Sequence, residues 1–205
     1  MRPASREPQA LLVGVLAALV VSGIAPHDRF TWVLEVAPIL IGVPVLVATF
    51  GCLRFTPTVY RLLAIHAVIL MIGGHYTYAE VPAGFWVRDA FGLARNDYDR
   101  LGHLAQGFVP ALVTRELLLR TSPLRRGRWL PTLVTAVALA ISALYELVEW
   151  WTALATGEAA TAFLGTQGDP WDTQWDMFTA LVGALLAQLL LARRQDREIA
   201  ALTGA

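Results

Sequence analysis

The 205-residue chain contains no lysine, a single cysteine and few charged side chains. Only 16% of its residues are charged, whereas 56% are hydrophobic, and its mean hydropathy is +0.54. Soluble domains carry about 25% charged residues, so this composition is typical of a polytopic membrane protein. The lone Cys52 excludes an intrachain disulfide and any metal site built from cysteines.

The charge balance and the missing motifs exclude further classes of function. Sixteen acidic residues balance sixteen basic ones, and no stripe of basic and aromatic residues indicates nucleic-acid binding. The chain also lacks a G-x-S-x-G elbow, a glycine-rich phosphate loop, an H-E-x-x-H motif and a dinucleotide fingerprint. The expected partners are therefore membrane lipids rather than nucleic acid.

Six apolar segments have lengths suited to helices that cross a bilayer. They are residues 10–24, 32–50, 59–74, 101–119, 131–151 and 175–192. None alternates with the period of two that marks a strand, so we expect an all-α, polytopic membrane protein. Residues 1–205 would form one domain with six transmembrane helices in one bundle. The first segment also has the form of a secretory signal, but a first helix is favoured because no clear cleavage site follows it.

The arginines predict the orientation of these helices. With six segments threaded through a bilayer, eleven of the sixteen arginines fall on one side and four on the other, and Arg115 lies within the fourth segment. The eleven are Arg2, Arg6, Arg54, Arg61, Arg120, Arg125, Arg126, Arg128, Arg193, Arg194 and Arg197. The positive-inside rule then places both termini in the cytoplasm. The loop 76–98 faces outward and, with apolar residues among its charges, is expected to lie in the membrane interface.

Ionisable residues recur at the predicted outer ends of the last three segments. They form three pairs, each on one segment: Asp99 and His103, Glu146 and Glu149, and Asp172 and Asp176. Spacings of three or four place each pair on one helical face, and the helical rise places all of them in one layer. Polar residues in membrane helices face the bundle interior or a wet cavity, so we expect a polar pocket that opens outward.

The carboxylates of this layer cannot all stay ionised in a buried pocket without opposite charge. A bound cation, shared protons, or an arginine from the outer loop would each supply the compensation. One or two divalent metal ions would also provide a Lewis acid and an activated water. The expected metal ligands are Asp99, His103, Glu146, Glu149, Asp176 and His75. The expected catalytic residues are His103, Glu146 and Glu149, and the expected substrate-binding residues are Trp86, Asp172 and Trp175.

Other polar residues have simpler interpretations. Asp169, which precedes a proline, has the form of a helix N-cap. Glu35 either joins the acidic layer or faces water. His66 is expected to make a buried hydrogen bond between helices, and Arg115 and Glu116 are expected to snorkel to the inner interface.

Three long stretches carry a resemblance to a known family. "NDYDRLGHLAQGFVPALVTRELLLR", "ISALYELVEWW" and "FLGTQGDPWDTQWDMFTALVGALL" resemble the YjdF family of bacterial inner-membrane proteins. This resemblance covers most of the chain and implies a multi-pass protein of the bacterial inner membrane. More distantly, the chain is similar to VanZ-like membrane proteins, and the matching positions are Asp99, His103, Glu146 and Asp176. Neither resemblance implies an established reaction.

Three hypotheses for the function follow. The first is a metal-dependent hydrolase or transferase that acts on a lipid or a lipid-linked phosphate. The second is a cation- or proton-coupled transporter, or an ion-binding membrane protein, with the same residues as a relay. The third is a non-enzymatic assembly factor whose polar core only fixes the register of the helices.

Overall fold

Helices make up all the regular structure in residues 6–157 and 161–204, which are the residues described by this computed structural model. They are α1 (Glu7–Ser22), α2 (Arg29–Thr49), α3 (Pro57–Tyr76), the 3-10 turn η1 (Tyr78–Glu80), α4 (Pro82–Phe91), α5 (Tyr98–Thr121), α6 (Trp129–Thr156), α7 (Thr161–Leu164) and α8 (Asp172–Thr203). The predicted all-α class is confirmed. Each of the six predicted segments corresponds to one long helix, namely α1, α2, α3, α5, α6 or α8.

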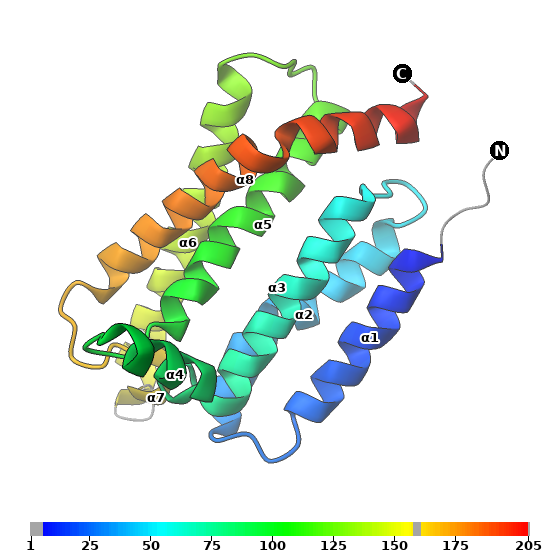
Figure 1. Cartoon of the computed structure of the whole chain (residues 1–205). Coiled ribbons are helices and arrows are strands. Elements are labelled where there is room, and N and C mark those ends of the chain that lie inside the picture. Colours follow the sequence, from blue (N-terminus) through cyan, green and yellow to red (C-terminus); the bar gives the residue numbers. More distant parts are fainter. Residues whose placement is uncertain (1–5, 158–160, 205) are drawn as a thin grey trace.

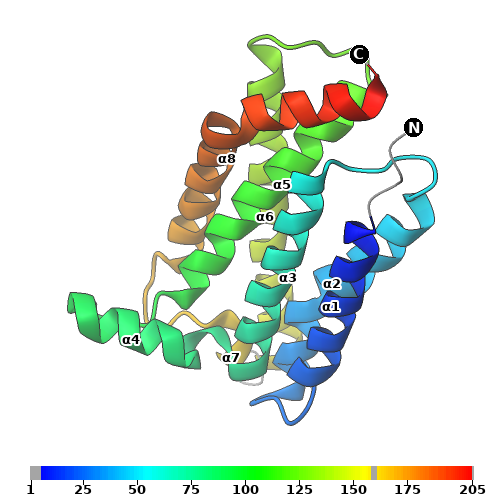
Figure 2. The same ribbon diagram turned by 45° about the vertical axis from the view of Figure 1, so that its right-hand side comes forward.

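The long helices lie side by side, with α5 in the middle (Figure 1). α5 packs along α8 and also contacts α6 and α3, while α3 contacts α1 and α2. α1 begins and α8 ends at the same end of the bundle, and α4 and α7 lie at the opposite end in both views (Figure 2). We call the end with α4 and α7 the acidic end, and the end where α8 finishes the arginine end.

Local sequence explains several helix starts. Asp28 caps α2, because its carboxylate accepts a hydrogen bond of 2.6 Å from the amide of Thr31. This hydrogen bond lowers the pKa of Asp28 below its ordinary value. α3 begins at Pro57, which suits the first turn of a helix because proline has no amide hydrogen to satisfy.

Two glycines bring α5 and α8 into direct backbone contact. A Cβ atom at Gly107 would overlap the carbonyl of Ala180, and one at Gly183 would overlap the carbonyl of Leu104. Small residues allow this close approach between helices in membranes. The contact holds the two helices at a fixed distance, and it fixes the position of the residues that each carries nearer the acidic end.

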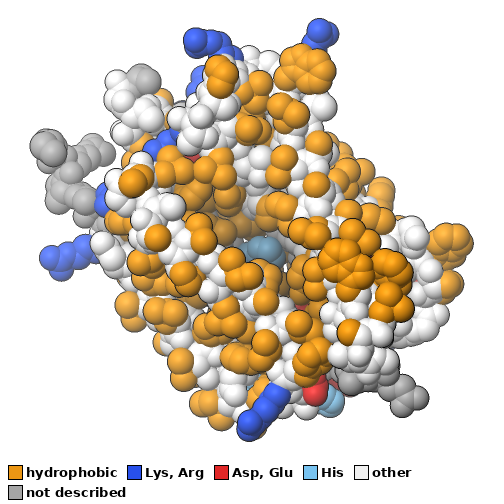
Figure 3. All heavy atoms as spheres, turned by 180° about the vertical axis from the view of Figure 1, so that it is seen from behind, with side chains coloured by type: hydrophobic (Ala, Val, Ile, Leu, Met, Phe, Trp, Pro, Cys, Tyr) orange, Lys and Arg blue, Asp and Glu red, His pale blue; other side chains and the backbone are white. Residues whose placement is uncertain are grey.

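The outer surface suits a lipid environment. Four helices, α2, α3, α6 and α8, are long and apolar enough to cross a membrane, and α1 is apolar but shorter. α5 is not one of these four helices, and it carries charged residues in its first turn (Asp99) and its last turn (Arg120). Hydrophobic side chains cover most of the face in Figure 3, whereas the arginine side chains lie at its edges. Large apolar side chains such as Val13, Ile41 and Leu189 are exposed, which is unfavourable in water and favourable in a bilayer.

α8 is longer than the apolar pattern predicts. It continues to Thr203, far beyond the predicted end at 192, and Figure 1 shows its last turns swinging across the arginine end. This polar part buries Gln195 and Ile199 against the bundle. Tertiary packing therefore extends the helix beyond the segment that hydropathy identifies.

The start of α8 also differs from the prediction. Asp169 is not the N-cap, because the helix begins at Asp172. The Asp169 carboxylate instead accepts a hydrogen bond from the amide of Trp171 and pairs with Arg100 at 2.9 Å. The ion pair with α5 holds the chain in a turn, and the helix begins two residues later than an N-cap at Asp169 would place it.

Arg115 and Glu116 do not snorkel, so that prediction is wrong. Glu116 is fully buried and accepts hydrogen bonds from the amide and hydroxyl of Thr56. Arg115 donates to the amide oxygen of Gln195 and to the carboxylate of Asp196. The last turns of α8 cover this end of α5, so both charges find partners inside the protein. We call this group the inner network.

Candidate functional site

α5, α6 and α8 bring one histidine and four carboxylates together near the acidic end. Ligand atoms of Asp99, His103 and Asp176 all lie within 4.8 Å of one another. The same holds for ligand atoms of His103, Glu146 and Glu149. His103 belongs to both groups and therefore lies between the two sets of carboxylates. We call these five residues the acidic cluster.

The two ring nitrogens of His103 face different partners. Nε2 lies 3.5 Å from Oδ1 of Asp99. Nδ1 lies 3.0 Å from Oε1 of Gln106 and 3.8 Å from Oε1 of Glu146. A proton on Nδ1 donates to Gln106 and leaves the lone pair of Nε2 on the Asp99 side, which is the orientation that a metal-ligating imidazole needs.

Two carboxylate oxygens of the cluster are buried without a hydrogen-bond partner among the described residues. They are Oδ1 of Asp176 and Oε1 of Glu146, whose residues are 2% and 7% exposed. The hydroxyl of Ser142, one turn from Glu146 on α6, is likewise buried and without a partner. Buried polar atoms are nearly always paired, and buried charges are paired or coordinate a metal. The cluster therefore has bonding capacity that a ligand could satisfy.

Glu35 does not face water. It is 3% exposed and accepts a hydrogen bond of 3.0 Å from the hydroxyl of Tyr145. The ring of Tyr145 in turn lies beside the ring of His103, with 6.3 Å between their centroids. The structure thus connects Glu35 to the acidic cluster through Tyr145, a residue that the sequence analysis did not single out.

Arg95, in the loop before α5, reaches towards the acidic end but pairs outside the cluster. Its Nη1 lies 2.5 Å from Oδ1 of Asp172 and 3.1 Å from the carbonyl of Thr166. Burial alone would lower the pKa of Arg95, and the hydrogen bond and charge of Asp172 raise it above its ordinary value. Within residues 6–157 and 161–204, no arginine nitrogen lies within 4.0 Å of a cluster carboxylate. The outer-loop arginine therefore leaves the cluster without a direct counter-charge.

Residues 163–167, which precede α8, cover the cluster. Phe163 on α7 is buried and packs against the ring of Tyr145. A Cβ atom at Gly165 would lie 4.0 Å from Oδ2 of Asp99. The side chain of Gln167 makes two hydrogen bonds with the backbone of Asn96, which fastens the loop to the start of α5. This cover lies where the sequence predicts an opening.

The expected substrate-binding residues lie in three different settings. Trp86 is exposed on α4. Trp175 is exposed on α8, where it packs against Phe178 and under the guanidinium of Arg100. Asp172 is buried and bound to Arg95. Their role in substrate binding stays a prediction.

His75 does not join the acidic cluster, and its assignment as a ligand is corrected. Its Nδ1 lies 2.9 Å from the carbonyl oxygen of Ser22, and its own carbonyl accepts from the amide of His27. It belongs to neither of the two ligand groups. The end of α3 packs against the α1–α2 connection, which draws this side chain away from α5.

His66 also differs from its prediction. Its Nε2 is buried, and it has no hydrogen bond in the described part of the chain. The side chain lines an apolar cavity between α1, α2 and α3. The expected hydrogen bond between helices is therefore absent from the described residues.

These features define an all-helical, multi-pass membrane protein with a buried acidic and histidine cluster at one end of its bundle. The family model described as "Predicted membrane protein (DUF2238)" matches residues 8–197, so the chain belongs to this family. The chain is also 54% identical over 189 residues to the inner membrane protein YjdF of Escherichia coli (strain K12), covering 91% of this chain and 90% of that protein. No solved structure matches it. The resemblance to the YjdF family is confirmed, and the protein is a multi-pass protein of the bacterial inner membrane.

Proposed function

We propose that Asp99, His103 and Asp176 hold one divalent metal ion, with Glu146 and Glu149 beside it as acid–base residues. The observation that carries this proposal is the pair of buried carboxylate oxygens without partners, on Asp176 and Glu146. A cation held by Asp176 would supply its missing bond and the missing positive charge, and the unpaired oxygen of Glu146 would be left to take a proton. Carboxylates with one imidazole suit Mg, Mn, Fe or Zn.

The reaction class we propose is hydrolysis or transfer at a lipid or lipid-linked phosphate. A metal ion bound here would polarise a phosphoryl oxygen and acidify a water. Glu146 or Glu149 would take a proton from that water as its oxygen bonds to phosphorus. The bond to the leaving group then breaks, and the same proton passes to the departing oxygen. The amphipathic helix α4, with Trp86 and Phe91 exposed, supports a substrate held at the membrane interface.

The proposed topology has α1, α2, α3, α5, α6 and α8 crossing the membrane within a single domain, residues 1–205. Both termini would lie in the cytoplasm, and the acidic end would face outward. The excess of arginine at the opposite end supports this orientation. The charges of α5 are tolerated because α3, α6 and α8 pack around it.

Packing weighs against a transporter that conducts along α5 and α8. Between the acidic cluster and the inner network the two helices meet through Gly107 and Gly183. Next come fully buried apolar side chains, Ala111, Leu112, Ala184 and Ala187. A cation or proton relay needs a continuous line of polar groups, and these four fully buried side chains are all apolar.

A comparison of the two polar groups weighs against a purely structural role. The inner network is satisfied, because Glu116, Arg115 and Gln195 all have hydrogen-bond partners. The acidic cluster leaves Asp176 and Glu146 with unpaired oxygens. A network that only fixes register works best when fully paired, since each unpaired buried group is destabilising.

Metal content of the purified protein tests the proposal. We expect about one divalent ion per chain after reconstitution in detergent, measured by elemental mass spectrometry, and its loss in His103→Ala and Asp176→Asn. Gln106→Leu removes the partner that orients His103 and should weaken metal affinity about 10- to 100-fold. His75→Ala is the matched control, a histidine at the same end but outside the cluster, and should keep its metal. A folded wild-type protein that binds no Mg, Mn, Fe or Zn would refute the site.

A further inference from the structure

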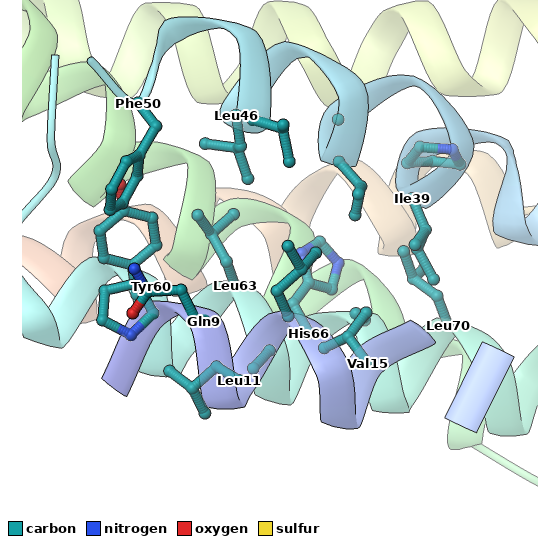
Figure 4. Close-up of a pocket in the computed structure, with 18 of the residues that line it drawn as sticks. Gln9, Leu11, Val15, Ile39, Leu46, Phe50, Tyr60, Leu63, His66 and Leu70 are labelled. Atoms are coloured by element: carbon teal, nitrogen blue, oxygen red, sulfur yellow. The ribbon is translucent and has the colours of Figure 1, made fainter. Parts of the chain in front are cut away.

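A second site lies apart from the acidic cluster, in an apolar cavity of about 420 Å³ between α1, α2 and α3. The cavity is elongated: Figure 4 shows Phe50 and Tyr60 at one end, and Ile39 and Leu70 at the other. Tyr60 and Leu70 are ten residues apart on α3, which corresponds to about 15 Å at the rise of a helix. This length is about half the hydrocarbon thickness of a bilayer, or the depth of one leaflet.

The surroundings of the cavity determine what can fill it. The helices around it expose the apolar side chains Val13, Ile41, Val45 and Val47, so the surface around the cavity suits lipid rather than water. The walls are mostly apolar, and Gln9, Tyr60 and His66 are the polar side chains among them. Most of the cavity therefore lacks the two or more polar partners that an ordered water needs. Hydrocarbon chains are the component of the bilayer that restores the missing van der Waals contacts along its walls.

An arginine side chain, Arg54, lies at one end of the cavity. The guanidinium of Arg54 lies over the ring of Phe50, 4.5 Å from its centroid. In the described residues no carboxylate lies within ion-pair distance of Arg54, whereas Arg61 nearby is paired with Glu7. An arginine without an acidic partner, next to a hydrocarbon-shaped cavity, matches a phosphate joined to an acyl chain.

We propose that this cavity binds an anionic phospholipid of the leaflet at the arginine end. One acyl chain lies between α2 and α3 from Phe50 towards Leu70, and its phosphate lies against Arg54. The length of the cavity matches a chain that ends near the middle of the membrane. The charge at its entrance selects lipids with a net negative headgroup.

Filling the cavity tests the chain-binding part. Gly42 lines the cavity, and a Cβ atom built there meets nothing within 4 Å, so Gly42→Phe should fill the space without distorting α2. Gly14 on α1 also meets nothing within 4 Å but does not line the cavity, so Gly14→Phe is the matched control. After delipidation and titration with phosphatidylglycerol, native mass spectrometry should show one tightly bound lipid on the wild type and on Gly14→Phe. Gly42→Phe should lose it.

Removing the charge tests the headgroup part. Arg54→Gln should weaken phosphatidylglycerol binding about fivefold, the effect of one arginine at an anionic surface, and should remove the preference over phosphatidylcholine. Arg125→Gln, an exposed arginine at the same end, should leave both unchanged. The proposal is overturned if Gly42→Phe keeps the lipid, or if Arg54→Gln retains the preference. It is also overturned if Gly42→Phe changes the oligomeric state and not lipid retention, since the occupant would then be a second copy of the chain.

Discussion

Asn96 connects three segments at the acidic end. It is 1% exposed, and its side-chain amide donates to the carbonyls of Ala79 and Val81, while its oxygen accepts from the amide of Tyr98. Its own backbone amide and carbonyl bond to the side chain of Gln167. The side chain of Asn96 therefore fixes η1 and the start of α5, and its backbone holds the loop that covers the acidic cluster.

We predict that Asn96→Ala destabilises the protein by about 2–4 kcal/mol, because three buried backbone groups lose their partners at roughly 1 kcal/mol each. Thermal or denaturant unfolding in detergent would measure the change. Gln174→Ala removes an exposed amide from the first turn of α8 and should change stability by less than about 0.5 kcal/mol. Equal effects of the two substitutions would contradict the connecting role of Asn96.

Residues such as Arg95 and Asn96 show why part of the site could not be predicted from sequence. The spacing of Asp99 with His103, and of Glu146 with Glu149, predicts shared helical faces, and the structure brings these side chains together. Arg95 lies in a loop without periodicity, and its partner Asp172 is 77 positions away. Helical spacing constrains residues on one helix, whereas a pairing between a loop and a distant helix depends on the tertiary fold.

At the scale of elements, the N-terminus of α3 is capped by carboxylates from two other helices. Glu116 of α5 accepts from the amide of Thr56, and Glu198 of α8 accepts from the amide and hydroxyl of Thr58. The first amides of a helix have no partner within it, and its N-terminus carries a partial positive charge. Both requirements are met by residues far away in sequence, which is why hydropathy predicts α3 but not what fixes its start.

Glu198 gives this arrangement a pH dependence. Burial on its own raises the pKa of Glu198, but hydrogen bonds from Thr58 and the contact with Arg194 lower it below its ordinary value. A carboxyl with a lowered pKa stabilises the fold above its unfolded pKa of about 4.3, and this contribution is lost as pH falls through the folded value. We predict that Glu198→Gln costs about 1–2 kcal/mol at pH 7 and that its deficit shrinks below about pH 4.

Unfolding of the Glu198→Gln variant and the wild type across this pH range would check the prediction. Glu80→Gln, an exposed glutamate at the acidic end, should show no such deficit at either pH. A Glu198→Gln deficit that persists unchanged at pH 3 would mean that the charge of Glu198 is not what caps α3.

At the scale of the whole molecule, the two ends of the bundle differ in kind. The arginine end is closed by the last turns of α8 and by the inner network, whose polar groups are paired. The acidic end is covered by short segments, α4, α7 and their loops, over a cluster with unpaired oxygens. Unpaired oxygens at one end and a fully paired network at the other favour a protein that acts on one side of the membrane.

The single cysteine offers a direct test of which side that is. Cys52 is exposed in the connection between α2 and α3, at the arginine end. With that end in the cytoplasm, a membrane-impermeant maleimide should label Cys52 only after the cells are broken, because the inner membrane shields it in intact spheroplasts. Ala90→Cys in a Cys52→Ala background places the thiol on the exposed face of α4 and should be labelled in intact spheroplasts. Labelling in the opposite order would place the acidic cluster in the cytoplasm, where a soluble phosphate compound replaces an outer-leaflet lipid as the substrate to test.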